Sequence, residues 1–123
     1  MLAGHSRGAA FAARLAFAEP ASYAGLVLIA SVHPRGFSLA RAGLAVTQLS
    51  ADRDESTSAQ RLAEARVNLP ASTKVVVIKG GNHSQFGFYG TYPFDGTPAI
   101  SRTSQIDATV RVLIDALQHA SGR

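Results

Sequence analysis

The sequence predicts an α/β fold in which helices flank a mostly parallel sheet. Two short runs, residues 25–30 and 74–79, are continuously apolar and rich in β-branched residues. Continuous rather than alternating apolarity is typical of strands covered on both faces, as in a parallel sheet. Segments with helical spacing of apolar residues lie between and around these runs, and such alternation favours parallel pairing. With 123 residues, the chain has the length of one domain.

The first helix is expected over residues 9–18, which are nearly all Ala, Phe and Leu. A proline at position 20 ends it, and its few charges indicate a helix buried against the sheet. Residues 44–49 are a weaker candidate for a third strand. Residues 56–67 begin with a polar cluster suited to helix capping and predict the second helix.

A third helix is predicted near the C-terminus, with Ser101 as its expected N-cap. Its apolar residues recur at helical spacing: Ile106, Val110, Leu113, Ile114 and Leu117. Before it, residues 84–100 form a long segment rich in glycine, proline and aromatic residues, in which Asp95 is expected to form a turn. Loops of this length in a compact domain are usually functional or disordered.

Composition narrows the function classes. The 12 Lys and Arg and 8 Asp and Glu give a net charge of +4, but the basic residues are scattered rather than clustered with aromatics, which argues against nucleic-acid binding. Without cysteine there is no disulfide, thiolate ligand or cysteine nucleophile. The four histidines lack metal-ligand spacing, and neither a metal nor a cofactor is expected.

Apolar runs are too short for a membrane span. The longest strongly apolar run, residues 24–30, is far below the roughly 20 residues that a span needs. The N-terminus also lacks the pattern of a signal peptide. The chain as it stands is therefore expected to be cytoplasmic, unless an export signal belongs to a missing N-terminal segment.

Residues 4–8 read Gly-His-Ser-Arg-Gly and fit the G-x-S-x-G pattern of a nucleophile elbow. In an elbow the serine, here Ser6, lies on a sharp strand-to-helix turn. Glycine is expected on both sides, because side chains there would collide with the neighbouring strand and helix. A very apolar helix follows, although little precedes the motif as a strand. The alternative is a glycine-rich helix start with Ser6 as an ordinary N-cap, and His5 is expected to support the turn.

His83 is the candidate general base, because it ends the run Gly-Gly-Asn-His directly after the strand predicted at residues 74–79. Histidine is the side chain most often used as a general base, and this one could reach the same sheet edge as Ser6. The alternative is a surface histidine. An acid that orients the histidine should follow a strand between the two in sequence. Asp54 is predicted for that role and Asp52 is the second choice, the other serving as a helix cap.

Two further groups of side chains lie near the predicted site. Phe86 and Tyr89, with the other aromatics of residues 86–94, either line an acyl pocket beside the histidine or cover the sheet edge. His33 and Arg35 are expected to be solvated loop residues rather than ligands.

Together these segments resemble the second half of an α/β-hydrolase, so that residues 1–123 would be a partial α/β-hydrolase domain. The run Gly-Gly-Asn-His-Ser-Gln-Phe-Gly-Phe-Tyr-Gly at residues 80–90 is similar to a bacterial group of small, dienelactone-hydrolase-like members. Asp-Gly at residues 95–96 and Ile-Ser-Arg at residues 100–102 extend the likeness.

The resemblance implies a serine hydrolase of small carboxylic esters or lactones with a Ser6–Asp54–His83 triad. Ser6 would attack the carbonyl, His83 would take its proton and Asp54 would fix the imidazole, giving an acyl-enzyme that water hydrolyses. The backbone N–H of Arg7 would supply one half of the oxyanion hole. The short connection at residues 31–43 suits accessible esters. Thioester or peptide hydrolysis would use the same triad.

The resemblance also implies N-terminal strands that this sequence lacks, together with the loop that donates the second oxyanion N–H. Their absence would expose a strand edge and an apolar helix face. The isolated chain is therefore expected to be poorly soluble, partly disordered or dependent on a partner, and weakly active or inactive. That partner would be a missing N-terminal half or a second copy. The competing hypothesis is an inactive remnant that acts through its exposed apolar surface.

Overall fold

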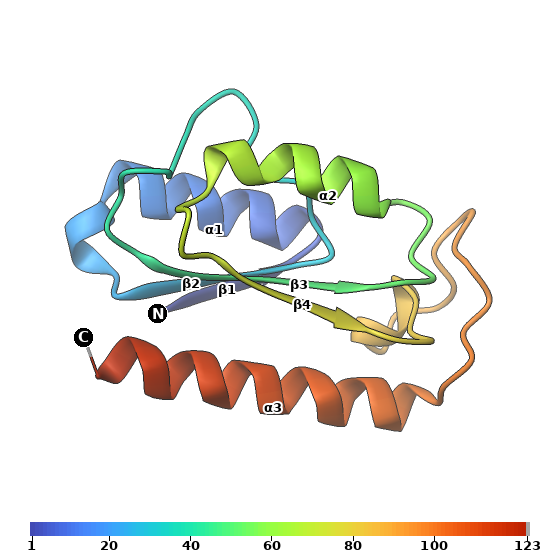
Figure 1. Cartoon of the computed structure of the whole chain (residues 1–123). Helices are drawn as coiled ribbons and strands as arrows, with labels where there is room; N and C mark the ends of the chain where they lie inside the picture. The colour runs from blue at the N-terminus through green and yellow to red at the C-terminus, as the bar shows by residue number, and fades with distance from the viewer. Residues whose placement is uncertain (123) are drawn as a thin grey trace.

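The computed structural model describes residues 1–122, which form a four-stranded sheet with helices on both faces (Figure 1). The strands are β1 (Leu2–His5), β2 (Gly25–Ile29), β3 (Ala45–Ala51) and β4 (Lys74–Ile78). All three neighbouring pairs are parallel, and the spatial order β1-β2-β3-β4 follows the sequence. The predicted α/β fold with a parallel sheet is confirmed.

Three α-helices cover the sheet: α1 (Arg7–Ala18), α2 (Ala59–Ala65) and α3 (Arg102–Ser121). Helices α1 and α2 lie on one face, and α3 runs along the other (Figure 1). Ser101 caps α3 as expected, because its side-chain oxygen accepts the N–H of Ser104 at 3.1 Å. Residues 1–122 also contain three short 3₁₀ turns: η1 (Pro20–Ser22), η2 (Arg66–Asn68) and η3 (Ser84–Phe86).

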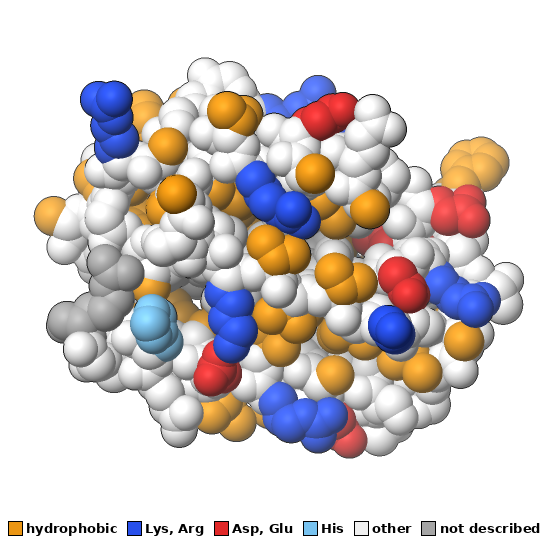
Figure 2. Space-filling view, in the orientation of Figure 1, with side chains coloured by type: hydrophobic (Ala, Val, Ile, Leu, Met, Phe, Trp, Pro, Cys, Tyr) orange, Lys and Arg blue, Asp and Glu red, His pale blue; other side chains and the backbone are white. Residues whose placement is uncertain are grey.

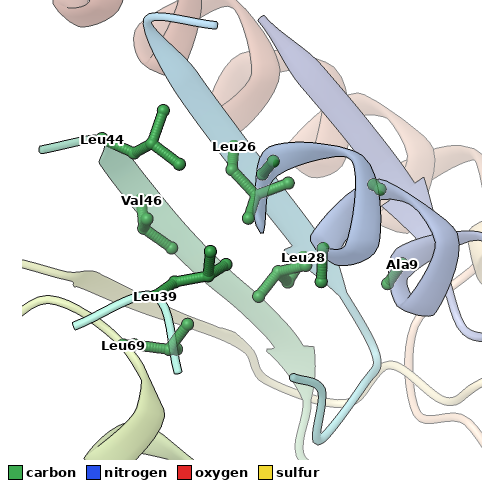
Figure 3. Close-up of a cluster of buried hydrophobic side chains, with 10 residues drawn as sticks. Ala9, Leu26, Leu28, Leu39, Leu44, Val46 and Leu69 are labelled. Atoms are coloured by element: carbon green, nitrogen blue, oxygen red, sulfur yellow. The ribbon is translucent and has the colours of Figure 1, made fainter. Parts of the chain in front are cut away.

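The face of the sheet under α1 packs on small side chains of that helix. The buried residues of α1 are all alanine: Ala9, Ala12, Ala13 and Ala16. They meet Leu26 and Leu28 of β2, and leucines from the connecting loops close the cluster (Figure 3). In contrast, Phe11 and Leu15 of α1 are 64% and 47% exposed. The expected burial of this apolar helix is therefore limited to its alanine face.

The opposite face packs against α3. Val27, Ile29, Leu49 and Ile78 form the buried cluster on this side, and Val112 is among the α3 residues that cover it. Of the predicted apolar stripe, Leu113 packs against this cluster, but other members do not. Val110, Ile114 and Leu117 are about half exposed. These three lie on a side of the helix turned away from the sheet, which packs instead on Ala108, Val112 and Ala116.

Within the described residues, β1 and β4 are the edge strands of the sheet. Val75 and Val77 of β4 are 41% and 50% exposed, so the prediction that residues 74–79 are covered on both faces is wrong. Only α3 covers this strand, through Val76 and Ile78.

Hydrophobic side chains lie among lysines and arginines on the side of the molecule seen in Figure 2. No helix in residues 1–122 combines the length and hydropathy needed to cross a membrane.

Candidate active site

The three residues predicted to form a triad each follow a strand. Ser6 comes directly after β1, Asp54 follows β3 and His83 follows β4. Because the C-terminal ends of parallel strands meet at one edge of a sheet, these residues converge. Ser6 and His83 line the same pocket, which has a volume of about 820 Å³. Asp54 lies behind His83, with its Oδ2 atom 2.8 Å from His83 Nδ1.

Ser6 occupies a strained turn between β1 and α1. Its φ of 55° and ψ of −116° place it outside the usual regions for an L-residue. The Ser6 N–H donates to Ile29 O at 2.8 Å, and the Ser6 carbonyl accepts the Ala9 N–H at 3.0 Å. Such strain persists where the surroundings hold a residue firmly, often at functional sites. The Ser6 side chain makes no capping hydrogen bond to α1, which argues against an ordinary N-cap serine.

Only one of the two glycines that flank Ser6 is required by close packing. A Cβ atom at Gly4 would lie 2.3 Å from the carbonyl oxygen of Gly8 and 2.6 Å from the amide nitrogen of Ala9. A Cβ atom at Gly8 would meet nothing within 4 Å among the described residues. The expectation that both positions need glycine is therefore wrong for Gly8. The close approach is that of β1 to the first turn of α1, and Gly4 is the residue on the strand.

These contacts predict opposite effects for two alanine substitutions. Gly4→Ala is expected to lower the free energy of unfolding by more than about 3 kcal/mol, because backbone atoms would have to move. Gly8→Ala is expected to raise it by up to about 1 kcal/mol, since alanine favours a helix over glycine. Chemical denaturation of both variants measures the difference. Similar destabilisation by the two substitutions would contradict the packing described for the turn.

Hydrogen bonds hold the carboxylate of Asp54 in a buried position. Asp54 and His83 are 4% and 2% exposed. Asp54 Oδ1 accepts the N–H and the hydroxyl of Ser56 at 2.9 and 2.5 Å, and Oδ2 accepts the hydroxyl of Thr57 at 2.8 Å. Burial alone would raise the pKa of Asp54, but the hydrogen bonds from His83, Ser56 and Thr57 outweigh it and lower the pKa. The carboxylate is therefore ionised at neutral pH and fixed in orientation.

Asp52, the second choice for this role, lies outside the arrangement around His83. Its Oδ1 atom accepts the N–H of Gly80 at 2.7 Å. The Asp52 N–H donates to Ile78 O at 3.2 Å. Asp52 thus ties the end of β3 to the end of β4, a structural contact rather than a partner for the histidine.

The loop that carries His83 is held from two sides. The Asp95 carboxylate accepts the N–H groups of His83 and Ser84 at 3.1 and 2.8 Å, and the Ser84 hydroxyl at 2.6 Å. From α3, the fully buried Gln105 accepts the Asn82 N–H at 3.1 Å and donates to the Asn82 carbonyl at 2.7 Å. Asp95 therefore anchors the histidine loop in addition to forming a turn.

Aromatic rings surround the imidazole of His83. Its ring centroid lies 4.8 Å from that of His5 and 4.4 Å from that of Tyr92. The pKa of His5 is lowered to about 4 by burial and then by His83, so His5 is neutral at pH 7. The Tyr89 hydroxyl lies 2.8 Å from His5 Nδ1, and Tyr89 lines the pocket. Phe86, by contrast, packs against the hydrophobic cluster on the α3 side.

Arginine and histidine side chains also line the pocket, beside small apolar residues such as Ala10, Ala30 and Val32. Arg7, His33, Arg35 and Arg61 all contribute to it, so His33 and Arg35 belong to the pocket rather than only to a solvated loop. The first N–H groups of a helix have no acceptor within that helix, and the Arg7 N–H can therefore donate to an oxyanion beside Ser6. No three His, Asp or Glu side chains gather as a metal site in residues 1–122.

Sequence reasoning missed several residues that position the site. Gln105 had no signal, because it lies off the predicted apolar stripe of the C-terminal helix, on the face that the structure buries instead. Ser56 had a signal, since an aspartate side chain often accepts the backbone N–H two residues on and closes a turn, and Thr57 follows it directly. Arg61 had none, because its place at the pocket depends on how α2 packs.

A family model described as Alpha/beta hydrolase family matches residues 1–107. The matched segment contains β1 to β4, α1, α2, the turn at Ser6 and the loop at His83. The chain matches no curated protein and no solved structure at a significant level. Since the match spans most of the chain and the parallel sheet agrees with it, the chain belongs to the alpha/beta hydrolase family.

Proposed function

We propose that the chain is a serine hydrolase of carboxylic esters or lactones that acts through Ser6, His83 and Asp54. The observation that carries the proposal is the buried 2.8 Å hydrogen bond between Asp54 and His83, at a pocket that Ser6 also lines. A serine on a strained turn, a histidine and an ionised carboxylate are the groups that nucleophilic acyl transfer needs.

In the proposed mechanism each group has one role. With Nδ1 of His83 donating to Asp54, Nε2 is the ring nitrogen that takes the proton of Ser6 as its Oγ attacks the carbonyl carbon. The resulting oxyanion accepts a hydrogen bond from the Arg7 N–H. The intermediate then collapses, the C–O bond to the leaving group breaks, and His83 returns the proton to the departing alcohol.

Water completes the cycle in the same way. His83 removes a proton from a water molecule, which attacks the acyl group on Ser6. The bond between the acyl carbon and Ser6 Oγ then breaks, His83 returns the proton to Oγ, and the carboxylic acid leaves. Ser6 makes no hydrogen bond to His83 in this conformation of residues 1–122. Catalytic hydrogen bonds of this kind often tighten only when substrate binds.

The first test is hydrolysis of 4-nitrophenyl acetate by the wild-type chain. The proposal predicts saturable release of nitrophenolate above the buffer rate. A burst of about one equivalent is expected if the acyl-enzyme is hydrolysed slowly. A folded protein that releases nitrophenolate no faster than buffer would contradict the proposal.

A second candidate function is a non-catalytic role in which the apolar surface binds a protein partner, either an N-terminal half or another copy of the chain. The half-exposed side chains of Leu15 on α1 and Ile114 on α3 favour it. The two candidates differ in the assay above. If the folded chain hydrolyses the ester no faster than its Ser6→Ala variant, the binding role is favoured.

A further inference from the structure

Three arginines from separate elements converge on the pocket of Ser6. Arg7 comes from α1, Arg35 from the loop between β2 and β3, and Arg61 from α2. The lining of this pocket contains no aspartate or glutamate in the described part of the chain. In residues 1–122 the close contacts between a basic and an acidic side chain are those of Lys74 with Asp115 and of His83 with Asp54. None of the three guanidinium groups is therefore paired with a carboxylate.

The carboxylates nearest to this pocket are already engaged or face elsewhere. Asp54 lies beneath it and accepts hydrogen bonds from His83, Ser56 and Thr57. Glu64 lines a smaller neighbouring pocket together with Arg35 and Arg61, and it accepts a hydrogen bond from Gln60 at 3.0 Å. Glu55 lines another pocket, on the side of Tyr92 and Phe94.

Arg61 is held beside the proposed triad. Its Nη1 atom donates to the carbonyl oxygen of Ser56 at 2.9 Å. Ser56 in turn donates to Asp54 and lies 3.1 Å from His83 Nδ1. The guanidinium of Arg61 is thus fixed to the same turn that orients the carboxylate, and its remaining N–H groups can serve a ligand.

His33 adds a polar contact to this region without adding a charge. Its Nδ1 atom lies 2.8 Å from the hydroxyl of Ser31. The pKa of His33 is lowered by burial and then by the nearby charges of Arg35 and Arg14. The imidazole is therefore neutral at pH 7, and the positive charge at this side of the pocket comes from the arginines.

We infer that the pocket binds esters that carry a second, anionic oxyacid group, and that Arg35 and Arg61 bind this group. Guanidinium groups match carboxylate and phosphate oxygens with paired N–H donors. Tyr89 and Tyr92, which line the pocket beside His83, would contact the uncharged part of the substrate. The inference rests on the proposed function and adds a substrate class to it.

The inference is tested with two pairs of esters, one pair for each side of the scissile bond. The first pair, 4-acetoxybenzoate and 4-acetoxybenzamide, places the charge on the leaving group. The second pair, monomethyl terephthalate and methyl 4-carbamoylbenzoate, places it on the acyl group. For at least one pair we expect kcat/KM to be at least about tenfold higher for the carboxylate, with the ratio falling as salt screens the charges.

Variants of Arg35 and Arg61 show whether these two side chains cause the preference for the carboxylate ester. In Arg35→Gln/Arg61→Gln the ratio of kcat/KM for carboxylate over carboxamide is expected to fall to near one. Arg61→Lys keeps the charge but loses the paired N–H donors, so it should retain part of the ratio, above that of the double variant. Arg111→Gln is the matched control, because Arg111 is exposed on α3 and lies outside the pocket. It should keep both the ratio and the wild-type activity.

Binding provides a readout that does not require turnover. The Kd of 4-hydroxybenzoate should be at least about tenfold lower than that of 4-hydroxybenzamide in the wild type, and similar to it in the double variant. Phenyl phosphate in the same titration shows whether phosphate is preferred to carboxylate. If neither ester pair is hydrolysed, the proposed function fails while the Kd values still decide the inference. Equal Kd values for charged and neutral ligands in the wild type would overturn it.

Discussion

Replacing Ser6 with alanine is expected to lower kcat for 4-nitrophenyl acetate by at least about 10⁴-fold, because the substitution removes the only atom that forms the acyl-enzyme. The Ser6 side chain makes no capping hydrogen bond, so its removal should leave the fold intact. Steady-state kinetics of the purified variant measures the loss. Any residual rate would come from binding and from the oxyanion donor at Arg7.

Two controls make the result for Ser6 interpretable. Ser121→Ala removes an exposed hydroxyl at the end of α3, which bonds only to the Leu117 carbonyl, and should leave turnover unchanged. Equal denaturation midpoints for Ser6→Ala and the wild type would exclude unfolding as the cause. A Ser6→Ala variant that keeps a tenth or more of the wild-type kcat would remove Ser6 from the mechanism.

Asp54→Asn is expected to lower kcat by about 10⁴-fold with little change in KM. An amide at this position would present an N–H group toward either His83 or the hydroxyls of Ser56 and Thr57, all of which now donate to the carboxylate. The imidazole would then favour the tautomer with its proton on Nε2, and that tautomer cannot accept the proton of Ser6. Steady-state kinetics separates kcat from KM.

Asp52→Asn is the matched control for this second prediction. Asp52 lies two residues away and bonds to the Gly80 N–H instead of to His83. Its replacement should change kcat by no more than a few-fold, although it can lower the denaturation midpoint. Equal losses of kcat in the two variants would show that the carboxylate at position 54 has no special role.

Continuous apolar runs predicted strands β2 and β4 well, but they gave only a weak signal for β3. Strand β3 is buried along nearly its whole length, yet three of its buried residues are polar: Thr47, Gln48 and Ser50. Gln48 is satisfied by Arg66, whose Nε atom donates to it at 2.9 Å. A buried polar residue with a partner far away in sequence lowers the local hydropathy without weakening the strand. The sequence alone does not reveal that partner.

Exposure of the outer elements depends on neighbours in space. Val75 and Val77 read as core residues, but in residues 1–122 no helix covers that face of β4. Phe11 reads as part of a buried helix, but α1 meets the sheet only through its alanines. Periodicity predicts that an element exists and which faces are apolar, whereas the number of covered faces is set by the arrangement of the layers.

The candidate site was predictable where a short motif carries its own geometry. Ser6 and His83 follow from glycine-containing turns at the ends of strands. Asp52 and Asp54 could not be separated with certainty, because both follow the same strand and only the turn closed by Ser56 brings Asp54 to His83. Arg61 joins the pocket through tertiary packing alone, as does the link of Gln105 to Asn82.

Covalent labelling with a fluorophosphonate, followed by mass spectrometry of the intact chain and its peptides, tests the central claim most directly. The account predicts one phosphonyl group per chain, attached to the peptide that contains Ser6. It also predicts no label in Ser6→Ala and slower labelling in Asp54→Asn, because the reagent reacts with a serine that a histidine has activated. A folded wild-type chain that stays unlabelled, or a label on another residue, would contradict the account.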